Sequence, residues 1–317
     1  MIIIAVALLV VLATIALALV FGGPRRPAPM SSISAPFAQV DFSDLPDLST
    51  FRAEDGQALA YRQYRPCTDT ASGSVLLVHG SSAGSASMHL LAKAMAAAGF
   101  AVYALDIRGH GASGRRGHID RIGRLELDLE AFVREVRPPR PSTLVGFSAG
   151  AGFALRVAGS ADQKLFDRYL LLAPFVGDQA PTQRPRNGGW TEVGLPRIFA
   201  IMLLNALGFR LANAMTVVRF ALSDEASASL TPQYDFNLAS NFRPPRDYID
   251  TIRRARQPCA VMAGIADEVF RSEQIERIVR KAGQDWRVTL IPNVGHIQLT
   301  LEPSAIAAVV SQLHNPW

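Results

Sequence analysis

The pentapeptide 146–150, Gly-Phe-Ser-Ala-Gly, has the residue types and spacing of a turn that can present a nucleophile. It fits the pattern G-x-S-x-G, follows the apolar run 143–145 and precedes a small-residue segment, 151–158, that is compatible with a helix. A strand, a sharp turn and a helix in this order expose a serine hydroxyl at the edge of a sheet. The glycines let strand and helix pass closely around a strained serine backbone. The setting therefore favours Ser148 as a nucleophile over an ordinary Gly/Ser turn.

A serine hydroxyl becomes a good nucleophile only when a base takes its proton and a third group holds that base. His296 comes shortly after the strand-like run 286–291, and Asp267 comes shortly after the run 259–263. Their order along the chain, Ser, Asp, His, is that of hydrolases with a nucleophile elbow. We expect His296 to be the base, with an exposed loop histidine as the alternative. We expect Asp267 to be the acid, with Glu268 as its neighbouring rival and a helix cap as its alternative role.

The negative charge that develops on an attacked carbonyl oxygen needs backbone N–H groups aimed at it. One donor should be Ala149, directly after the nucleophile, and the other should come from the turn that follows the apolar run 75–78. In that turn we expect Ser81 to donate, with Ser82 second. The residues that we expect to contact substrate are Ser82, Phe147 and Phe175.

The glycine-rich segment 106–113 follows the expected strand 101–105. It has neither the G-x-x-x-x-G-K-[ST] pattern nor Rossmann spacing, so we expect a structural turn near the site and no phosphate loop. His79 and His110 should be buried, hydrogen-bonded side chains with no role as base or ligand. No His/Cys/Asp/Glu cluster has metal-ligand spacing, so we expect neither metal nor cofactor.

The elements that must position these residues alternate between strand and helix. The continuous apolar run 75–78 predicts a strand buried on both faces. Further strands are expected at 101–105, 143–147 and 168–172, with helical patterns between them. Such alternation indicates an α/β fold with a mostly parallel sheet and helices on both faces. A hairpin, 49–52 and 57–64, precedes it.

The alternation stops after Pro174 and resumes at 257. We therefore divide the body of the chain into a first core part, 38–174, an insertion, 175–256, and a second core part, 257–317. The insertion is longer than any ordinary loop. It contains an apolar, helix-like stretch at 198–214 and can cover a ligand crevice at the edge of the sheet.

The first 22 residues predict a membrane anchor. Residues 1–21 contain one polar residue, Thr14, and no charged side chain, and as a helix they would be about 30 Å long, enough to cross a bilayer core. No basic residues precede the apolar run, which favours an anchor over a cleaved signal peptide. Residues 23–37, rich in Gly, Pro and Ser, read as a linker. Because Arg25 and Arg26 follow the run, we expect a single-pass protein of a bacterial inner membrane with its body in the cytoplasm.

The composition of the chain excludes several other classes of function. The chain has 317 residues, 49% of them hydrophobic, and a net charge of +5 that comes almost entirely from scattered arginines. A nucleic-acid surface needs a basic stripe, so we expect no nucleic-acid partner. Two isolated cysteines, Cys67 and Cys259, form neither a disulfide framework nor a metal site. Nothing in the sequence indicates an oligomeric state.

Together these motifs resemble a known family. They are His79-Gly80, Asp106-x-Arg108-Gly109-His110-Gly111-x-Ser113, Gly146-x-Ser148-x-Gly150, Asp267 and His296. From about Ser49 to Leu313 the chain resembles the α/β-hydrolase fold, and it is similar to the monoglyceride lipase, lysophospholipase and serine aminopeptidase group. The resemblance implies Ser148 as nucleophile, Asp267 as acid, His296 as base and the insertion as a cap. Ala149 departs from the Met or Gln of many lipases in the group, which leaves a backbone donor in place.

The leading hypothesis is a membrane-anchored serine hydrolase that cleaves carboxylic esters of lipid-like substrates, such as a monoacylglycerol or a lysophospholipid, through an acyl-Ser148 intermediate. Its partners would be a small acyl ester and, through residues 1–22, the bilayer. An acyltransferase or thioesterase with the same triad is the alternative enzyme. A non-catalytic, membrane-tethered interaction module is the alternative outside enzymes, because fold alone does not decide function.

Overall fold

A central eight-stranded sheet organises the computed structural model, which describes residues 2–315. The strand order is β1-β2-β4-β3-β5-β6-β10-β11. Strand β2 is antiparallel to both of its neighbours, β1 and β4, and all other neighbouring strands are parallel. The strands are β1 (Leu48–Arg52), β2 (Ala58–Tyr64), β3 (Ser74–Val78), β4 (Ala101–Leu105), β5 (Ser142–Phe147), β6 (Arg168–Leu172), β10 (Cys259–Gly264) and β11 (Arg287–Ile291).

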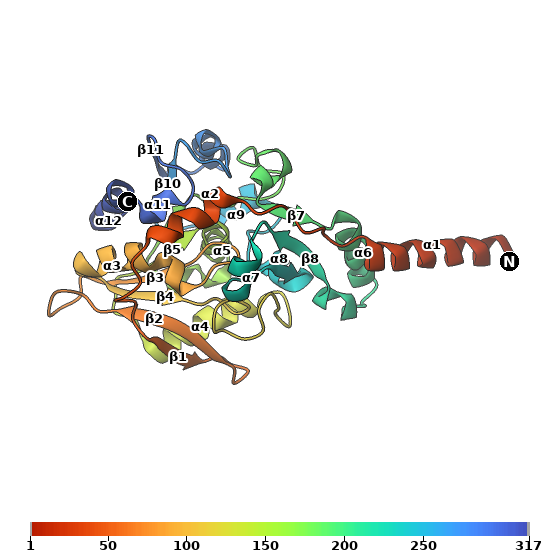
Figure 1. The fold of residues 1–317 in the computed structure, drawn as a ribbon, viewed down its shortest axis with the longest axis horizontal. Helices are drawn as coiled ribbons and strands as arrows, with labels where there is room; N and C mark the ends of the chain where they lie inside the picture. Colours follow the sequence, from red (N-terminus) through yellow and green to blue (C-terminus); the bar gives the residue numbers. More distant parts are fainter. Residues whose placement is uncertain (1, 316–317) are drawn as a thin grey trace.

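Helices cover both faces of this sheet (Figure 1). One face carries α3 (His89–Ala97), α11 (Gln298–Leu301) and α12 (Pro303–His314), which contact one another. The other carries α4 (Arg124–Val136), α5 (Ala149–Ala158), α9 (Tyr248–Arg254) and α10 (Ile275–Lys281). Every residue of β3, β4, β5 and β10 is buried, as covered parallel strands require. The predicted α/β fold is confirmed.

The chain between β6 and β10 forms the insertion, and it contains more strand than the sequence suggested. A second, antiparallel sheet consists of β7 (Thr191–Val193), β8 (Thr216–Phe220) and β9 (Gln233–Asp235). Its helices are α6 (Leu195–Ala206), α7 (Asp224–Ser229) and α8 (Phe236–Asn241). The continuous helix expected over 198–214 was wrong: α6 ends at Ala206, and Gly208 adopts a positive φ of 88° that stops it.

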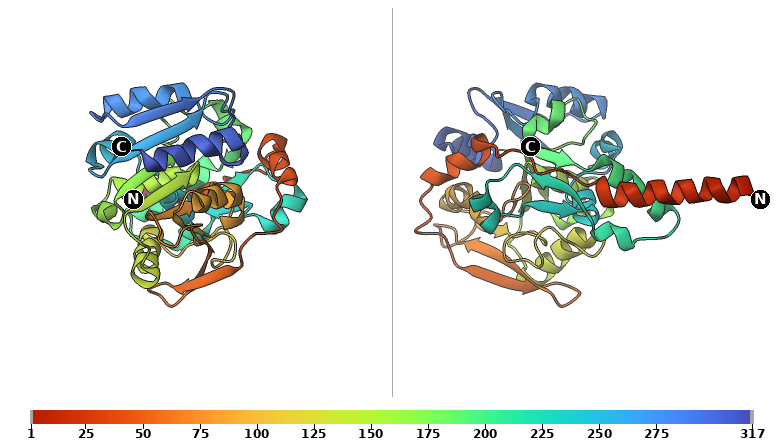
Figure 2. Two further views of the ribbon diagram at one scale, coloured as in Figure 1. Left: turned by 90° about the vertical axis from the view of Figure 1, so that its left-hand side faces the viewer. Right: turned by 45° about the vertical axis from the view of Figure 1, so that its right-hand side comes forward.

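The N-terminal helix α1 (Ile2–Phe21) stands clear of the body (Figure 2). Among the described residues it is the one helix long and apolar enough to cross a membrane. No residue of α1 is buried, and only its last turns touch the insertion. A short helix, α2 (Ser31–Ser34), follows in the segment expected to be a linker.

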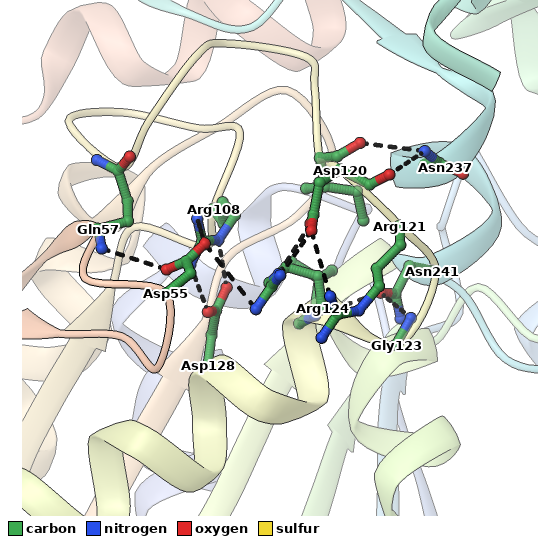
Figure 3. Close-up of polar contacts among 12 residues, drawn as sticks. Asp55, Gln57, Arg108, Asp120, Arg121, Gly123, Arg124, Asp128, Asn237 and Asn241 are labelled. Carbon is green, nitrogen blue, oxygen red and sulfur yellow. Dashed lines mark hydrogen bonds and ion pairs between the residues drawn. The ribbon is translucent and has the colours of Figure 1, made fainter. Parts of the chain in front are cut away.

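A buried charge cluster joins the hairpin turn, the loop after β4 and α4 (Figure 3). The Arg108 guanidinium makes two 2.7 Å hydrogen bonds to Asp128 and two 3.0 Å bonds to Asp55. Burial raises the pKa of Asp128 in spite of Arg108. For the more exposed Asp55, burial also raises the pKa, but hydrogen bonds from Arg108 outweigh it and the net change is downward. Asn241 on α8 accepts from the Gly123 N–H and ties the insertion to the same loop.

Replacement of Arg108 by methionine should lower the free energy of unfolding of the protein. The variant leaves the Asp128 carboxylate buried without its cation, and breaking a buried ion pair in this way costs about 3–5 kcal/mol. Denaturant unfolding of the two proteins measures the difference. Arg121→Met, which removes a 3.6 Å surface pair with Asp120, is the matched control and should change stability by less than about 1 kcal/mol. Equal losses would contradict a structural role for the cluster.

Candidate active site

The turn at Ser148 has the strained geometry of a nucleophile elbow. Ser148 lies between β5 and α5 with φ 55° and ψ −117°, a backbone conformation that non-glycine residues rarely adopt. A Cβ on Gly146 would lie 2.2 Å from the Gly150 carbonyl oxygen, and one on Gly150 would lie 2.3 Å from the His79 carbonyl oxygen. Both glycines are therefore required, because any side chain would push the helix off the strand.

Three predicted residues meet at the carboxyl edge of the sheet. The Ser148 hydroxyl lies 3.0 Å from His296 Nε2, and His296 Nδ1 lies 2.8 Å from Asp267 Oδ2. Because a carboxylate only accepts, Nδ1 carries the ring proton and Nε2 is the acceptor for the serine hydroxyl. All three side chains are buried. In this order the groups can move a proton away from the serine.

Asp267 and Glu268 take different tasks in the structure. Burial opposes ionisation of Asp267, but the facing His296 ring and the N–H groups of Phe270 and Val269 outweigh it, so the pKa of this carboxyl lies below its usual value. Glu268 accepts a hydrogen bond from the backbone N–H of His296. The carboxylate that faces the imidazole is therefore Asp267, while its neighbour holds the backbone of the same histidine.

The turn after β3 runs directly against the nucleophile. A Cβ on Gly80, the residue before Ser81, would lie 3.3 Å from Ser148 Cβ. Ala149 is the first residue of α5, so its N–H has no carbonyl partner within the helix. Ala149 follows Ser148 directly and Ser81 follows Gly80, which lies beside it; their role as oxyanion donors stays a prediction.

The polar groups of Ser82 are all bonded to residues of the insertion. Its hydroxyl donates to the Thr231 carbonyl, its N–H donates to the Tyr234 hydroxyl, and its carbonyl accepts from the Thr231 N–H. The residue is buried and has φ 70°. These hydrogen bonds fasten the turn to the insertion, and contact of Ser82 with substrate stays a prediction.

The two phenylalanines support the catalytic candidates. The Phe147 ring is buried and lies 4.9 Å from the His296 ring, centre to centre, so it packs against the imidazole. Phe175 is half-buried, and its N–H donates to the Ser148 carbonyl. Its ring lies 6.1 Å from that of Phe270, which also packs against His296. Contact of either ring with substrate stays a prediction.

Two residues of the insertion reach the site without having been predicted. The Trp190 indole N–H donates to the Ser81 hydroxyl at 2.8 Å, and its ring packs on Phe220. The Tyr234 hydroxyl lies 2.5 Å from His110 Nε2. Trp190 and Ser81 are 109 positions apart in the sequence, and Tyr234 and His110 are 124 positions apart. No local sequence pattern could therefore have indicated these contacts.

His79 and His110 are buried and belong to one chain of hydrogen bonds, as expected of structural histidines. His79 Nδ1 lies 2.7 Å from the Gly80 carbonyl, and its Nε2 accepts from the Ile107 N–H. His110 Nδ1 faces the Ile107 carbonyl, and its Nε2 faces Tyr234. Both rings thus donate at one nitrogen and accept at the other, which requires the neutral form. Burial lowers the pKa of both imidazoles, and for His110 the neighbouring His79 adds to the effect.

Acidification should therefore destabilise the protein. Below about pH 6.5 an unfolded histidine binds a proton, whereas a native ring with a lowered pKa stays neutral. Because the unfolded state then binds more protons than the native state, the free energy of unfolding falls as the pH decreases from there. Each such ring contributes a slope of up to about 1.4 kcal/mol per pH unit. Denaturant unfolding at several pH values measures it, and His110→Gln should flatten the slope. An unchanged slope in this variant would mean that native and unfolded His110 take up a proton over the same pH range, which would contradict the lowered pKa.

Among residues 2–315, no group of three or more His, Cys, Asp or Glu side chains is placed to hold a metal ion. Ser148 and His296, which can exchange the proton, and Asp267, which orients the imidazole, are side chains of the protein itself.

The fold and this site define an α/β-hydrolase: a mostly parallel sheet with a serine elbow after β5, an aspartate after β10 and a histidine after β11. A family model described as serine aminopeptidase, S33, matches residues 69–304, which is most of the chain. The chain therefore belongs to the serine aminopeptidase S33 family.

Similar proteins agree with this assignment. A monoacylglycerol lipase of Mycolicibacterium smegmatis is 35% identical over 114 residues, a match that spans 32% of this chain and only 38% of that relative. A soluble variant of monoglyceride lipase from Saccharomyces cerevisiae, solved with a substrate analog, superposes with a TM-score of 0.64 at 19% identity, over 87% of this chain and 94% of that one. A monoacylglycerol lipase of Paleococcus ferrophilus gives a TM-score of 0.60 at 19% identity, over 80% and 98%. At these identities the two structures show the fold alone.

Proposed function

We propose that this protein is a membrane-anchored serine hydrolase that cleaves carboxylic esters of lipid-like substrates. The observation that carries the proposal is the hydrogen-bonded series Ser148, His296, Asp267, with separations of 3.0 and 2.8 Å at the carboxyl edge of the sheet. Such a series makes a serine nucleophilic and can return the proton to a leaving group.

In the proposed reaction, Ser148 Oγ attacks the ester carbonyl carbon while His296 Nε2 takes the hydroxyl proton. The N–H groups of Ser81 and Ala149 stabilise the tetrahedral oxyanion. When the C–O bond breaks, the imidazolium gives its proton to the departing alcohol and leaves an acyl-Ser148. Water, deprotonated by His296, then attacks the acyl carbon, and the carboxylic acid departs as Ser148 regains its proton. Asp267 stays ionised and holds the ring throughout.

A lipid-like substrate is supported by two independent features. The curated relative is a monoacylglycerol lipase, and α1 is a 20-residue apolar helix of a length that can span a bilayer. The body would lie on the cytoplasmic side of a bacterial inner membrane, because Arg25 and Arg26 follow α1. A cleaved signal sequence is the competing role of α1, and N-terminal sequencing of the membrane-bound protein distinguishes the two.

The test is a hydrolysis panel with the full chain in detergent. Its substrates are a monoacylglycerol, a lysophospholipid, p-nitrophenyl butyrate and an aminoacyl p-nitroanilide, with Ser148→Ala as the control. We expect release of free fatty acid from at least one lipid ester by the wild type alone. Cleavage of the anilide without any ester would contradict an ester hydrolase, and acyl transfer to an added alcohol in place of water would indicate a transferase.

A further inference from the structure

The helix α6 and the turn after it expose an unusual amount of apolar surface. The residues that form this α6 apolar surface are Leu195, Phe199, Met202, Leu203, Leu207, Phe209 and Leu211, exposed by 45–96%. No charged residue occurs from 198 to 209, and Arg197 and Arg210 flank the run. Exposed apolar surface of this extent marks an interaction site.

This surface lies at the base of α1 (Figure 1). Ile15, Ala18 and Leu19 of α1 are half-buried, and Leu19 packs into a small cluster around Ile201 of α6. At the end of α1, the Gly22 carbonyl accepts from the Arg197 N–H. The anchor and the insertion are therefore in direct contact.

The Arg197 side chain fastens the two helices together. Its guanidinium donates to the carbonyls of Leu19 and Val20 at 2.7 and 3.0 Å, and to that of Thr216 in β8 at 2.7 Å. The last carbonyls of a helix have no partner within it and carry the negative end of the helix dipole. Arg197 thus provides hydrogen-bond donors for the last backbone carbonyls of α1 and links them to the second sheet of the insertion.

If α1 spans the bilayer, its length fixes how deep α6 lies in the membrane. Twenty residues span about 30 Å, which matches the whole hydrocarbon core. Ile15 and Leu19 precede Phe21 by six and two residues (21 − 15 and 21 − 19), or about 9 and 3 Å along the axis. Whatever packs against them lies in the outer part of that core, where unpaired charges are costly and apolar side chains are favoured.

We propose that α6 is a second membrane-embedded element, an interfacial helix whose apolar surface lies among the acyl chains of the leaflet in which α1 ends. Arg197 holds it at this depth. The inference rests on the proposed anchoring by α1 and goes beyond it, because it assigns a lipid-facing surface to the insertion. Trp190, which donates a hydrogen bond to Ser81, lies five residues before Leu195 (195 − 190). A short segment of the insertion therefore connects the turn beside Ser148 with the lipid-facing helix.

The test is lipid quenching of a fluorophore on the full chain in phosphatidylcholine–phosphatidylglycerol vesicles. Cys67 is exposed and Cys259 is buried, so the wild type accepts one NBD label, at Cys67. Cys67 belongs to the loop between β2 and β3, and this loop lies at the end of the body away from α1 (Figure 1). In a Cys67→Ser background, Phe199→Cys and Leu211→Cys report on the α6 apolar surface, and Leu9→Cys reports on the anchor. Nitroxide-bearing lipids then measure contact with acyl chains.

We expect the labels at 199 and 211 to be quenched by these lipids nearly as strongly as the label at 9, while the label at Cys67 is not quenched. Quenching at 9 alone would overturn the inference and leave the anchor in place. No quenching at 9 would contradict the anchor itself. Blue-shifted emission at 199 without lipid quenching, increasing with protein concentration, would mean that a second copy covers the surface and would also overturn the inference.

Arg197→Gln tests the clamp in the same assay. We expect quenching at 199 to fall while quenching at 9 is retained, because α1 still spans but no longer holds α6. Circular dichroism and the unfolding midpoint of the variant report whether the body stays folded. In a folded variant, undiminished quenching at 199 would show that Arg197 does not set the depth of α6.

Discussion

Ser148→Ala should remove ester hydrolysis almost completely while the fold persists. Loss of a triad nucleophile lowers kcat by about 10⁶-fold in the serine hydrolases where it has been measured, and the residual rate comes from binding and the oxyanion donors. The same loss is expected here because the Ser148 hydroxyl is the group that His296 Nε2 faces. Initial rates on p-nitrophenyl butyrate, compared with the wild type at equal concentration, measure it.

Ser81→Ala is the matched control for this substitution. It removes a hydroxyl from the neighbouring turn, together with its bond to Trp190, but keeps the backbone N–H that we assign to the oxyanion. Because the donor is retained, the loss of kcat should be far smaller than for Ser148→Ala. Comparable losses in the two variants would mean that the Ser81 hydroxyl takes part in the chemistry.

Asp267→Asn should lower kcat by about 10⁴-fold. An amide can donate to His296 Nδ1, which stabilises the tautomer with its proton on Nε2 and so removes the acceptor for the serine hydroxyl. The amide also lacks the negative charge that stabilises the imidazolium. Because a carboxylate that remains ionised is replaced by a neutral group of the same shape, the loss reports chemistry more than packing.

Glu268→Gln separates the two adjacent carboxylates. Glu268 accepts from the backbone N–H of His296, and a glutamine oxygen can accept the same bond. We therefore expect only a small change in kcat. A loss as large as that of Asp267→Asn would contradict the assignment of the acid, and a small loss in both would contradict the triad.

Much of the core could be predicted because its signals are local. The strands at β3, β4 and β5 are apolar runs buried on both faces, and their expected bounds agree with the structure to within one residue. Gly146 and Gly150 indicated the elbow, because only glycine fits between strand and helix there. In a parallel sheet, residues placed after successive strands converge at one edge, which brought Asp267 and His296 to Ser148.

The insertion could not be predicted in this way. Strands β7 and β9 have three residues each, too few for an alternating pattern, and they exist because β8 pairs with both. The contacts of Trp190 and Tyr234 with the core depend on how the insertion folds back. Which of Asp267 and Glu268 faces the imidazole depended on the conformation of one turn, and sequence could only rank them.

The central claim is that Ser148 carries the acyl group, and trapping that serine tests it most directly. The folded full chain is incubated with a fluorophosphonate probe, digested and analysed by mass spectrometry. We predict a single adduct on the peptide that contains Ser148, formed in the wild type, strongly slowed in Asp267→Asn and absent in Ser148→Ala. No adduct on the folded wild-type protein, or an adduct on another residue that persists in Ser148→Ala, would contradict the account.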